Sequence, residues 1–193
     1  EKEKQIGGIP AKEIPAYRLD KDIMLQELSG LMCPGIEFKL GVELNSDNAS
    51  DILNGYEAIY LATGLGKKIS LFDIEAKGIF YAEDFLKRYN NKQITTEDLG
   101  DTVVVIGGGN TAMDAAVCAK LGGVREVIVM YRRNKFEMPA WEREFQAATG
   151  SGVQFLWQSL PTDINLKDDK VESITYCKVE LGEKDASGRR KPQ

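Results

Sequence analysis

One stretch of this sequence decides the fold: an aliphatic run that ends in three glycines and is followed by small residues. It reads Val103-Val104-Val105-Ile106-Gly107-Gly108-Gly109-Asn110-Thr111-Ala112. The β-branched residues at 102–106 predict a strand that is buried on both faces of a parallel sheet. Residues 110–121 predict a helix that ends at Gly122 and Gly123, and residues 126–131 predict a second strand. This order predicts a βαβ unit with parallel strands.

The glycines follow the pattern G-x-G-x-x-A, which is typical of a site for a dinucleotide pyrophosphate. Gly107 suits a tight turn, Gly109 lets a phosphate approach the backbone, and Ala112 keeps the helix close to its strand. Free N–H groups at the helix N-terminus point at the phosphates. Because strand, turn, helix and second strand all occur in order, we favour a nucleotide site over a purely structural turn. The predicted contacts are Gly107, Gly108, Gly109, Asn110, Thr111 and Ala112.

The end of the second predicted strand indicates which dinucleotide binds. An NAD site carries a carboxylate there, which accepts hydrogen bonds from the ribose hydroxyls. This chain has Arg132, Arg133 and Lys135 instead. Guanidinium groups suit the 2′-phosphate of NADP(H), so we favour NADP(H) over NAD. The alternative is a solvated basic strand end that binds nothing.

Composition narrows the function classes. The chain has 193 residues, 42% of them hydrophobic, and a net charge of −5, so it can form a real core and has no overall field that attracts nucleic acid. It has no histidine, which excludes mechanisms based on an imidazole. Cys33, Cys118 and Cys177 form no CxxC pair, so we expect no metal site and three buried thiols. No membrane span or signal peptide is expected, and the cytoplasm is the expected location.

The remaining elements are predicted from periodicity and from glycine and proline punctuation. We expect helices at Lys21–Leu31 (with Asp20 as N-cap), Tyr81–Tyr89 and Ala140–Ala148 (opened by Pro139). We expect strands at Glu37–Leu40, Ala58–Ala62, Val153–Gln158 and Val171–Glu180, irregular chain at 1–19 and 67–80, and a turn at 182–193. Trp141, Phe145 and Ala148 are spaced as a helix stripe that faces the core.

Three stretches, Gly107–Asp114, Tyr131–Arg133 and Glu137–Ala140, resemble the small (beta) subunit of NADPH-dependent glutamate synthase. That family belongs to the flavoproteins with two dinucleotide-binding domains. Trp141 and the tail Leu181–Arg190 resemble most the selenate reductase flavoprotein subunit, one member of this group. In the first half, the resemblance aligns Glu1 with an FAD ribose contact and Gly8 with the FAD pyrophosphate. It aligns Thr63 and Gly64 with the crossover from the FAD domain to the NADPH domain, and it implies that these two residues belong to the partial FAD site as well.

The resemblance implies an α/β fold with a Rossmann-like parallel sheet at residues 65–193 and a partial FAD-binding segment at residues 1–64. It also implies a parent enzyme that transfers hydride from NADPH to FAD and passes electrons through 4Fe-4S clusters to a partner subunit or domain. Hydride transfer needs no acid–base group, so no catalytic residue is expected in this chain.

The family's first glycine fingerprint, its cysteine-rich segment and its closing Gly-Asp motif have no counterpart in these 193 residues. We therefore expect a fragment that binds NADP(H), has an incomplete FAD site and does not turn over alone. A non-catalytic NADP(H) sensor or docking module is the alternative. The flavin-like segment at residues 1–64 favours the flavoprotein, because a free-standing sensor has no need of it.

Overall fold

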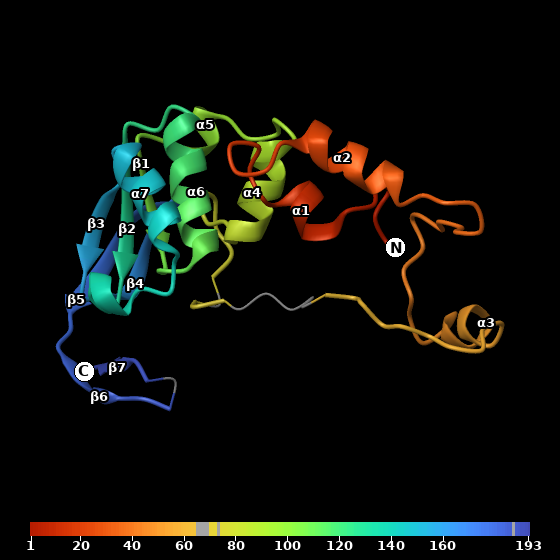
Figure 1. Ribbon diagram of the computed structural model, residues 1–193. Helices are drawn as coiled ribbons and strands as arrows, with labels where there is room; N and C mark the ends of the chain where they lie inside the picture. The colour runs from red at the N-terminus through yellow and green to blue at the C-terminus, as the bar shows by residue number, and fades with distance from the viewer. Residues whose placement is uncertain (65–69, 73, 187) are drawn as a thin grey trace. The chain divides into compact units, whose positions relative to one another are not determined.

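The computed structural model describes residues 1–64, 70–72, 74–186 and 188–193 (Figure 1). Contacts within the chain divide it into two compact units, Glu1–Leu71 and Phe72–Gln193. The predicted domain boundary, between residues 64 and 65, adjoins a stretch outside the described residues. That stretch includes Lys67 and Lys68, and Ser187 of the tail is likewise outside.

The second unit is built on a parallel sheet with the strand order β1-β2-β3. Strands β1 (Thr102–Ile106) and β2 (Glu126–Tyr131) and the connecting helix α6 (Asn110–Leu121) have the predicted bounds. Val103 pairs with Val127 and Val105 with Val129 in parallel register. After α7 (Glu142–Gly150), β3 (Gln154–Trp157) adds to the other side of β2, also in parallel. The predicted βαβ unit and the Rossmann-like α/β fold are confirmed.

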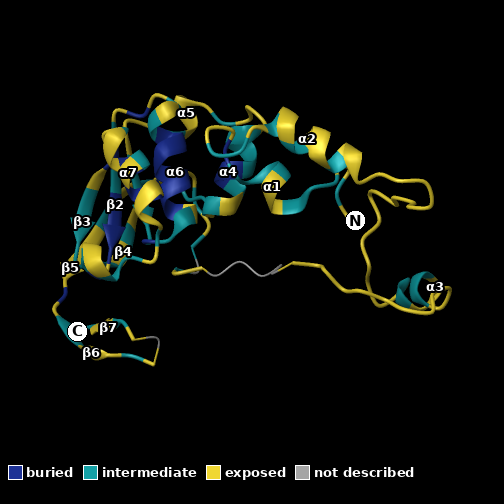
Figure 2. Ribbon diagram, viewed as in Figure 1, coloured by how far each residue is buried: buried dark blue, intermediate teal, exposed yellow. Residues whose placement is uncertain are grey.

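Helix α6 forms the centre of the core. Its residues from Ala112 to Ala119 are all buried, and they form the dark band of Figure 2. The helix contacts β1 and β2, and it also contacts α7 and α4 (Ala82–Asn90), which buries Phe85 and Leu86. A helix buried on nearly every side needs apolar neighbours around it, and these elements provide them.

Helix α7 begins at Glu142, two residues later than predicted. Met138, which precedes Pro139, has an extended backbone (ψ 127), as expected for a residue before proline. The N–H of Ala140 donates to the Gly108 carbonyl and the N–H of Trp141 to the Asn110 side chain, so both residues precede the helix. Phe145 and Ala148 are buried as predicted, but Trp141 is 66% exposed, so its predicted place in the core is wrong.

Two antiparallel hairpins follow the parallel sheet. Strands β4 (Ser159–Lys167) and β5 (Lys170–Lys178) are joined through Asp168 and Asp169, which both have positive φ, as a tight hairpin turn requires. Strands β6 (Leu181–Lys184) and β7 (Arg190–Pro192) form the second hairpin. Only β5 was expected; the stretch of β4 was not assigned, and the tail was expected to be a turn. Four-residue α5 (Thr96–Leu99) precedes β1.

The first unit contains helices α1 (Gly8–Lys12), α2 (Lys21–Gly30) and α3 (Ala49–Leu53). The Asp20 carboxylate caps α2 as predicted, accepting from the N–H of Asp22 at 2.9 Å and of Ile23 at 3.1 Å. The predicted strands at residues 37–40 and 58–62 are wrong. Both stretches are exposed and belong to no sheet among the described residues, and a strand forms only where a neighbour completes its hydrogen bonds.

The thiols differ from expectation as well. Cys118 is buried in α6, but Cys33 and Cys177 are exposed. Within the described ranges, no helix combines the length and the apolar character that a membrane crossing requires.

Candidate nucleotide-binding site

Gly107 opens the turn that follows β1. Its φ of +137° is a conformation that L side chains rarely adopt, so glycine is required there. Its N–H donates to the Met130 carbonyl at 3.0 Å, which ties the turn to β2. A Cβ placed on Gly107 would lie 3.5 Å from the Cβ of Ala112, so the start of α6 packs closely on the end of β1, as predicted for these two positions.

Gly108 and Gly109 face different surroundings. A Cβ on Gly108 would lie 2.6 to 2.9 Å from three ring atoms of Tyr131, whereas a Cβ on Gly109 would meet no atom within 4 Å. The Tyr131 ring is buried, and its hydroxyl donates to the Glu137 carbonyl at 3.0 Å. Packing therefore requires a glycine at 108, and Gly109 leaves open space beside the turn.

Gly109 is the N-cap of α6. The N–H groups of Ala112 and Met113 donate to its carbonyl at 3.0 and 3.1 Å. For the N–H groups of Asn110 and Thr111, no acceptor is found among the residues that the structure describes. The first N–H groups of a helix carry partial positive charge, and here they lie beside the open side of Gly109. Such a helix N-terminus suits a phosphate.

A second segment is hydrogen-bonded to the turn. The Asn110 side chain accepts from the Trp141 N–H at 2.9 Å, and the Gly108 carbonyl accepts from the Ala140 N–H at 3.0 Å. The sequence predicted Asn110 as a ligand, but not that its side chain binds the backbone of Trp141 beside the glycines. Asn110 and Trp141 are 31 residues apart, so no local sequence pattern indicates this hydrogen bond.

The three predicted cations after β2 lie in different environments. Arg132 is exposed. Arg133 is only 3% exposed; its Nε donates to the Arg190 carbonyl at 2.6 Å and its Nη2 donates to Asp185 Oδ2 at 2.9 Å. Lys135 is exposed, with its Nζ 4.3 Å from the centre of the Phe145 ring. The structure thus leaves Arg132 and Lys135 accessible to a ligand and directs Arg133 toward the β6–β7 hairpin.

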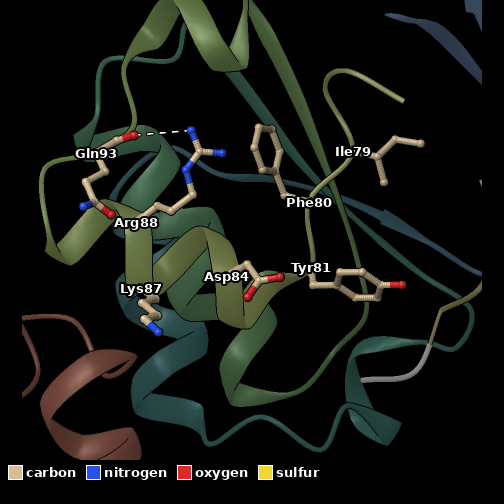
Figure 3. A pocket seen from close by; sticks show the side chains of 7 residues that line it. All are labelled: Ile79, Phe80, Tyr81, Asp84, Lys87, Arg88 and Gln93. Atoms are coloured by element: carbon tan, nitrogen blue, oxygen red, sulfur yellow. Dashed lines mark hydrogen bonds between the residues drawn. The ribbon is translucent and has the colours of Figure 1, made fainter. Parts of the chain in front are cut away.

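Two cavities lie in the second unit. One of about 420 Å³ borders the segment that carries the predicted cations, and its lining includes Lys135, Phe136 and Ala140. The other, of about 360 Å³, lies at α4, where Arg88 lies over the Phe80 ring at 5.3 Å and donates to the Gln93 carbonyl at 3.3 Å (Figure 3). No predicted site residue lines the second cavity.

The four predicted FAD contacts lie in two stretches of the first unit, near its start and at residues 63–64. The Glu1 carboxylate accepts from the Glu3 N–H at 3.0 Å, and Gly8 begins the short helix α1. Thr63 and Gly64 lie in an exposed stretch. Within the described part of the chain, no hydrogen bond or ion pair joins Glu1 or Gly8 to Thr63 or Gly64.

Comparison with known proteins supplies the wider context. A family model described as "Pyridine nucleotide-disulphide oxidoreductase" matches residues 7–186. The glutamate synthase [NADPH] small chain of Escherichia coli (strain K12) is 34% identical over 98% of this chain and 43% of the relative. The NADP(+)-dependent formate dehydrogenase subunit beta of Moorella thermoacetica is 34% identical over 96% of this chain and 27% of the relative.

The chain therefore spans less than half the length of these two relatives. Among solved structures, Lactococcus lactis thioredoxin reductase matches 48% of this chain and 28% of its own chain at 29% identity, with a TM-score of 0.36. The family model extends over the glycine turn, the basic strand end and both units. The chain belongs to the pyridine nucleotide-disulphide oxidoreductase family.

Proposed function

We propose that this chain binds NADPH at the glycine turn between β1 and α6, as the nicotinamide-binding part of an FAD-dependent oxidoreductase. The names of the two relatives described above include NADPH and NADP(+), which supports this choice of nucleotide. The proposal for the longer protein is that hydride passes from NADPH to FAD, and electrons then pass through iron–sulfur clusters to a partner subunit or domain. With three free thiols in the chain, we keep the cytoplasm as the proposed location.

One observation carries the proposal: an open glycine turn and an exposed guanidinium lie at the same edge of the sheet. Strands β1 and β2 are parallel neighbours, so their carboxyl ends meet there. Strand β1 is followed by the turn that has the open side of Gly109, and strand β2 is followed directly by exposed Arg132. A dinucleotide that lays its pyrophosphate on the turn would bring its adenosine ribose toward the end of β2. No carboxylate stands between Tyr131 and Lys135 to favour a free 2′-hydroxyl.

The residues of this chain bind and orient the nucleotide, and the reactive hydride is the nucleotide's own. The backbone N–H groups of Asn110 and Thr111 would hold the pyrophosphate, and Arg132 with Lys135 would hold the 2′-phosphate. Glu1, Gly8, Thr63 and Gly64 remain predicted flavin contacts of the longer protein.

Calorimetric titration of the chain with NADPH, NADH and FAD tests this proposal. We expect NADPH to bind more tightly than NADH, and FAD not to bind stoichiometrically. Arg132→Ala should weaken NADPH binding by about tenfold or more, the equivalent of one charge-assisted hydrogen bond, and leave NADH nearly unaffected.

The matched control is Arg125→Ala. Arg125 is an exposed arginine that pairs with Asp101 at 3.4 Å just before β2 begins, at the opposite end of the strand. Arg125→Ala should change neither the NADPH affinity nor the NADH affinity. Equal losses of NADPH and NADH affinity in Arg132→Ala would contradict the phosphate role.

A further inference from the structure

The β6–β7 hairpin is bonded at two places to the segment that follows β2. Arg133 donates to Asp185 of the hairpin at 2.9 Å and to the Arg190 carbonyl at 2.6 Å. Glu137 accepts from the Arg190 N–H at 2.9 Å, and the Arg190 Nε lies 3.9 Å from the same carboxylate oxygen. These contacts span 52 to 57 residues of sequence. We call this set of four residues the hairpin latch.

The latch is shielded from solvent on the side of β2. The Arg133 side chain is 4% exposed and the Glu137 side chain 14%, while Asp185 on the hairpin is 24% exposed. An ion pair that is this deeply buried holds its geometry, because separating the partners would leave an uncompensated buried charge. Arg133 is therefore fixed in place and is not presented to a ligand.

Arg132 lies between two anchored neighbours. On one side, the Tyr131 ring packs against Gly108 and its hydroxyl donates to Glu137. On the other side, Arg133 is fixed by the hairpin. Restricting the backbone on both sides of Arg132 lowers the conformational cost of bringing its guanidinium to an anion.

We propose that the hairpin latch positions Arg132 for the 2′-phosphate, so that the preference for NADPH over NADH depends on a hairpin that does not touch the nucleotide. The inference rests on the proposed function above. In it, Arg133, Asp185, Glu137 and Arg190 are positioning residues.

The competing role for Arg133 makes the opposite prediction. If Arg133 were itself a phosphate ligand, Asp185 would compete with the phosphate for its guanidinium, and Asp185→Asn would strengthen NADPH binding. If Arg133 acts through the latch, Asp185→Asn loosens the segment and weakens NADPH binding. The sign of one change in affinity separates the two roles.

The experiment is calorimetry of the full chain and three variants with NADPH and with NADH. Asp185→Asn should weaken NADPH binding about tenfold, the equivalent of one charge-assisted hydrogen bond, and leave NADH binding unchanged. Asp185→Glu keeps the carboxylate and should restore most of the NADPH affinity. Asp101→Asn removes a carboxylate from the exposed pair with Arg125 and should have no effect. Near-UV circular dichroism confirms that each variant is folded.

The outcomes separate this inference from the proposed function. A wild-type chain that does not bind NADPH would overturn both. If the wild-type chain binds NADPH, three results for Asp185→Asn would overturn the latch alone. These are an unchanged NADPH affinity, a higher NADPH affinity, or an equal loss of NADPH and NADH affinity. Selective loss of NADPH affinity with rescue by Asp185→Glu is the result expected of a positioning role.

Discussion

At the scale of single residues, the three consecutive glycines at 107–109 are constrained in different ways. Position 107 requires glycine because of its backbone conformation, and position 108 requires glycine because a side chain would clash with the Tyr131 ring. Neither reason applies to Gly109, where a side chain would point into open space. The motif predicts all three as ligand contacts. The structure separates the position that maintains the fold from the position that leaves room for a nucleotide.

Two alanine substitutions test this separation. Gly108→Ala should lower the free energy of unfolding by about 1–3 kcal/mol, because the Tyr131 ring is buried and anchored through its hydroxyl and cannot move aside cheaply. Gly109→Ala is the matched control and should cost less than about 1 kcal/mol, with roughly tenfold weaker NADPH binding. Urea unfolding and calorimetry measure the two effects. Equal destabilisation by both substitutions would contradict the assignment.

At the scale of elements, α6 is the best predicted and the most deeply buried part of the chain. Its pattern is local: a β-branched strand before it, small residues within it and two glycines after it. Burial also fixes the chemistry of the thiol that it carries. Two causes raise the pKa of Cys118 to about 12: burial has the larger effect, and the negative charge of Asp114 has the smaller. A protonated, enclosed thiol is a poor nucleophile.

Thiol labelling therefore reports on the packing of α6. At pH 8, iodoacetamide should modify exposed Cys33 and Cys177 in the folded chain and leave Cys118 unmodified until the chain unfolds.

The raised pKa of Cys118 also implies that the free energy of unfolding falls as the pH rises from about 9 toward 12, because only the unfolded state then loses the Cys118 proton. Cys118→Ala should remove that part of the pH dependence. Rapid labelling of all three thiols in the folded chain would show that α6 opens readily.

The elements that sequence analysis missed depend on distant partners. Residues 58–62 form a continuous apolar run, as in a buried strand, yet they have no neighbouring strand in the described part of the chain. The role of Arg133 was equally hidden, because its partner Asp185 lies 52 residues later. Local patterns predicted β1, α6, β2 and the cap of α2. They could not predict which of two adjacent arginines would be buried against a hairpin.

At the scale of the whole molecule, burial is divided unevenly between the two units. The hydrophobic core cluster lies entirely within Phe72–Gln193. Of the described residues in Glu1–Leu71, only Pro15 is buried, and many large apolar side chains are exposed, Tyr60 at 92%. The candidate nucleotide site lies wholly in the unit with the core. We therefore expect backbone amides to be better protected from hydrogen exchange in Phe72–Gln193 than in Glu1–Leu71.

Hydrogen exchange of the intact chain, read by mass spectrometry, checks this expectation. Amides of β1, α6 and β2 should exchange slowly, and those of α1, α2 and α3 much faster, because few buried contacts protect the first unit. Addition of NADPH should slow exchange at residues 107–111 and 131–135 and nowhere in the first unit. Protection that spreads into residues 1–64 would mean that the nucleotide contacts both units.

Trp141 also gives the chain an optical property, because its backbone N–H is bonded to the Asn110 side chain beside the glycine turn and its indole is exposed. The other tryptophan, Trp157, is stacked on Phe155 with ring centres 5.0 Å apart. Tryptophan emission overlaps the absorption band of a reduced nicotinamide, and the oxidised ring lacks that band. An indole at the pyrophosphate turn is therefore a donor for resonance energy transfer. A nucleotide bound there would dim the intrinsic fluorescence of the chain according to its redox state.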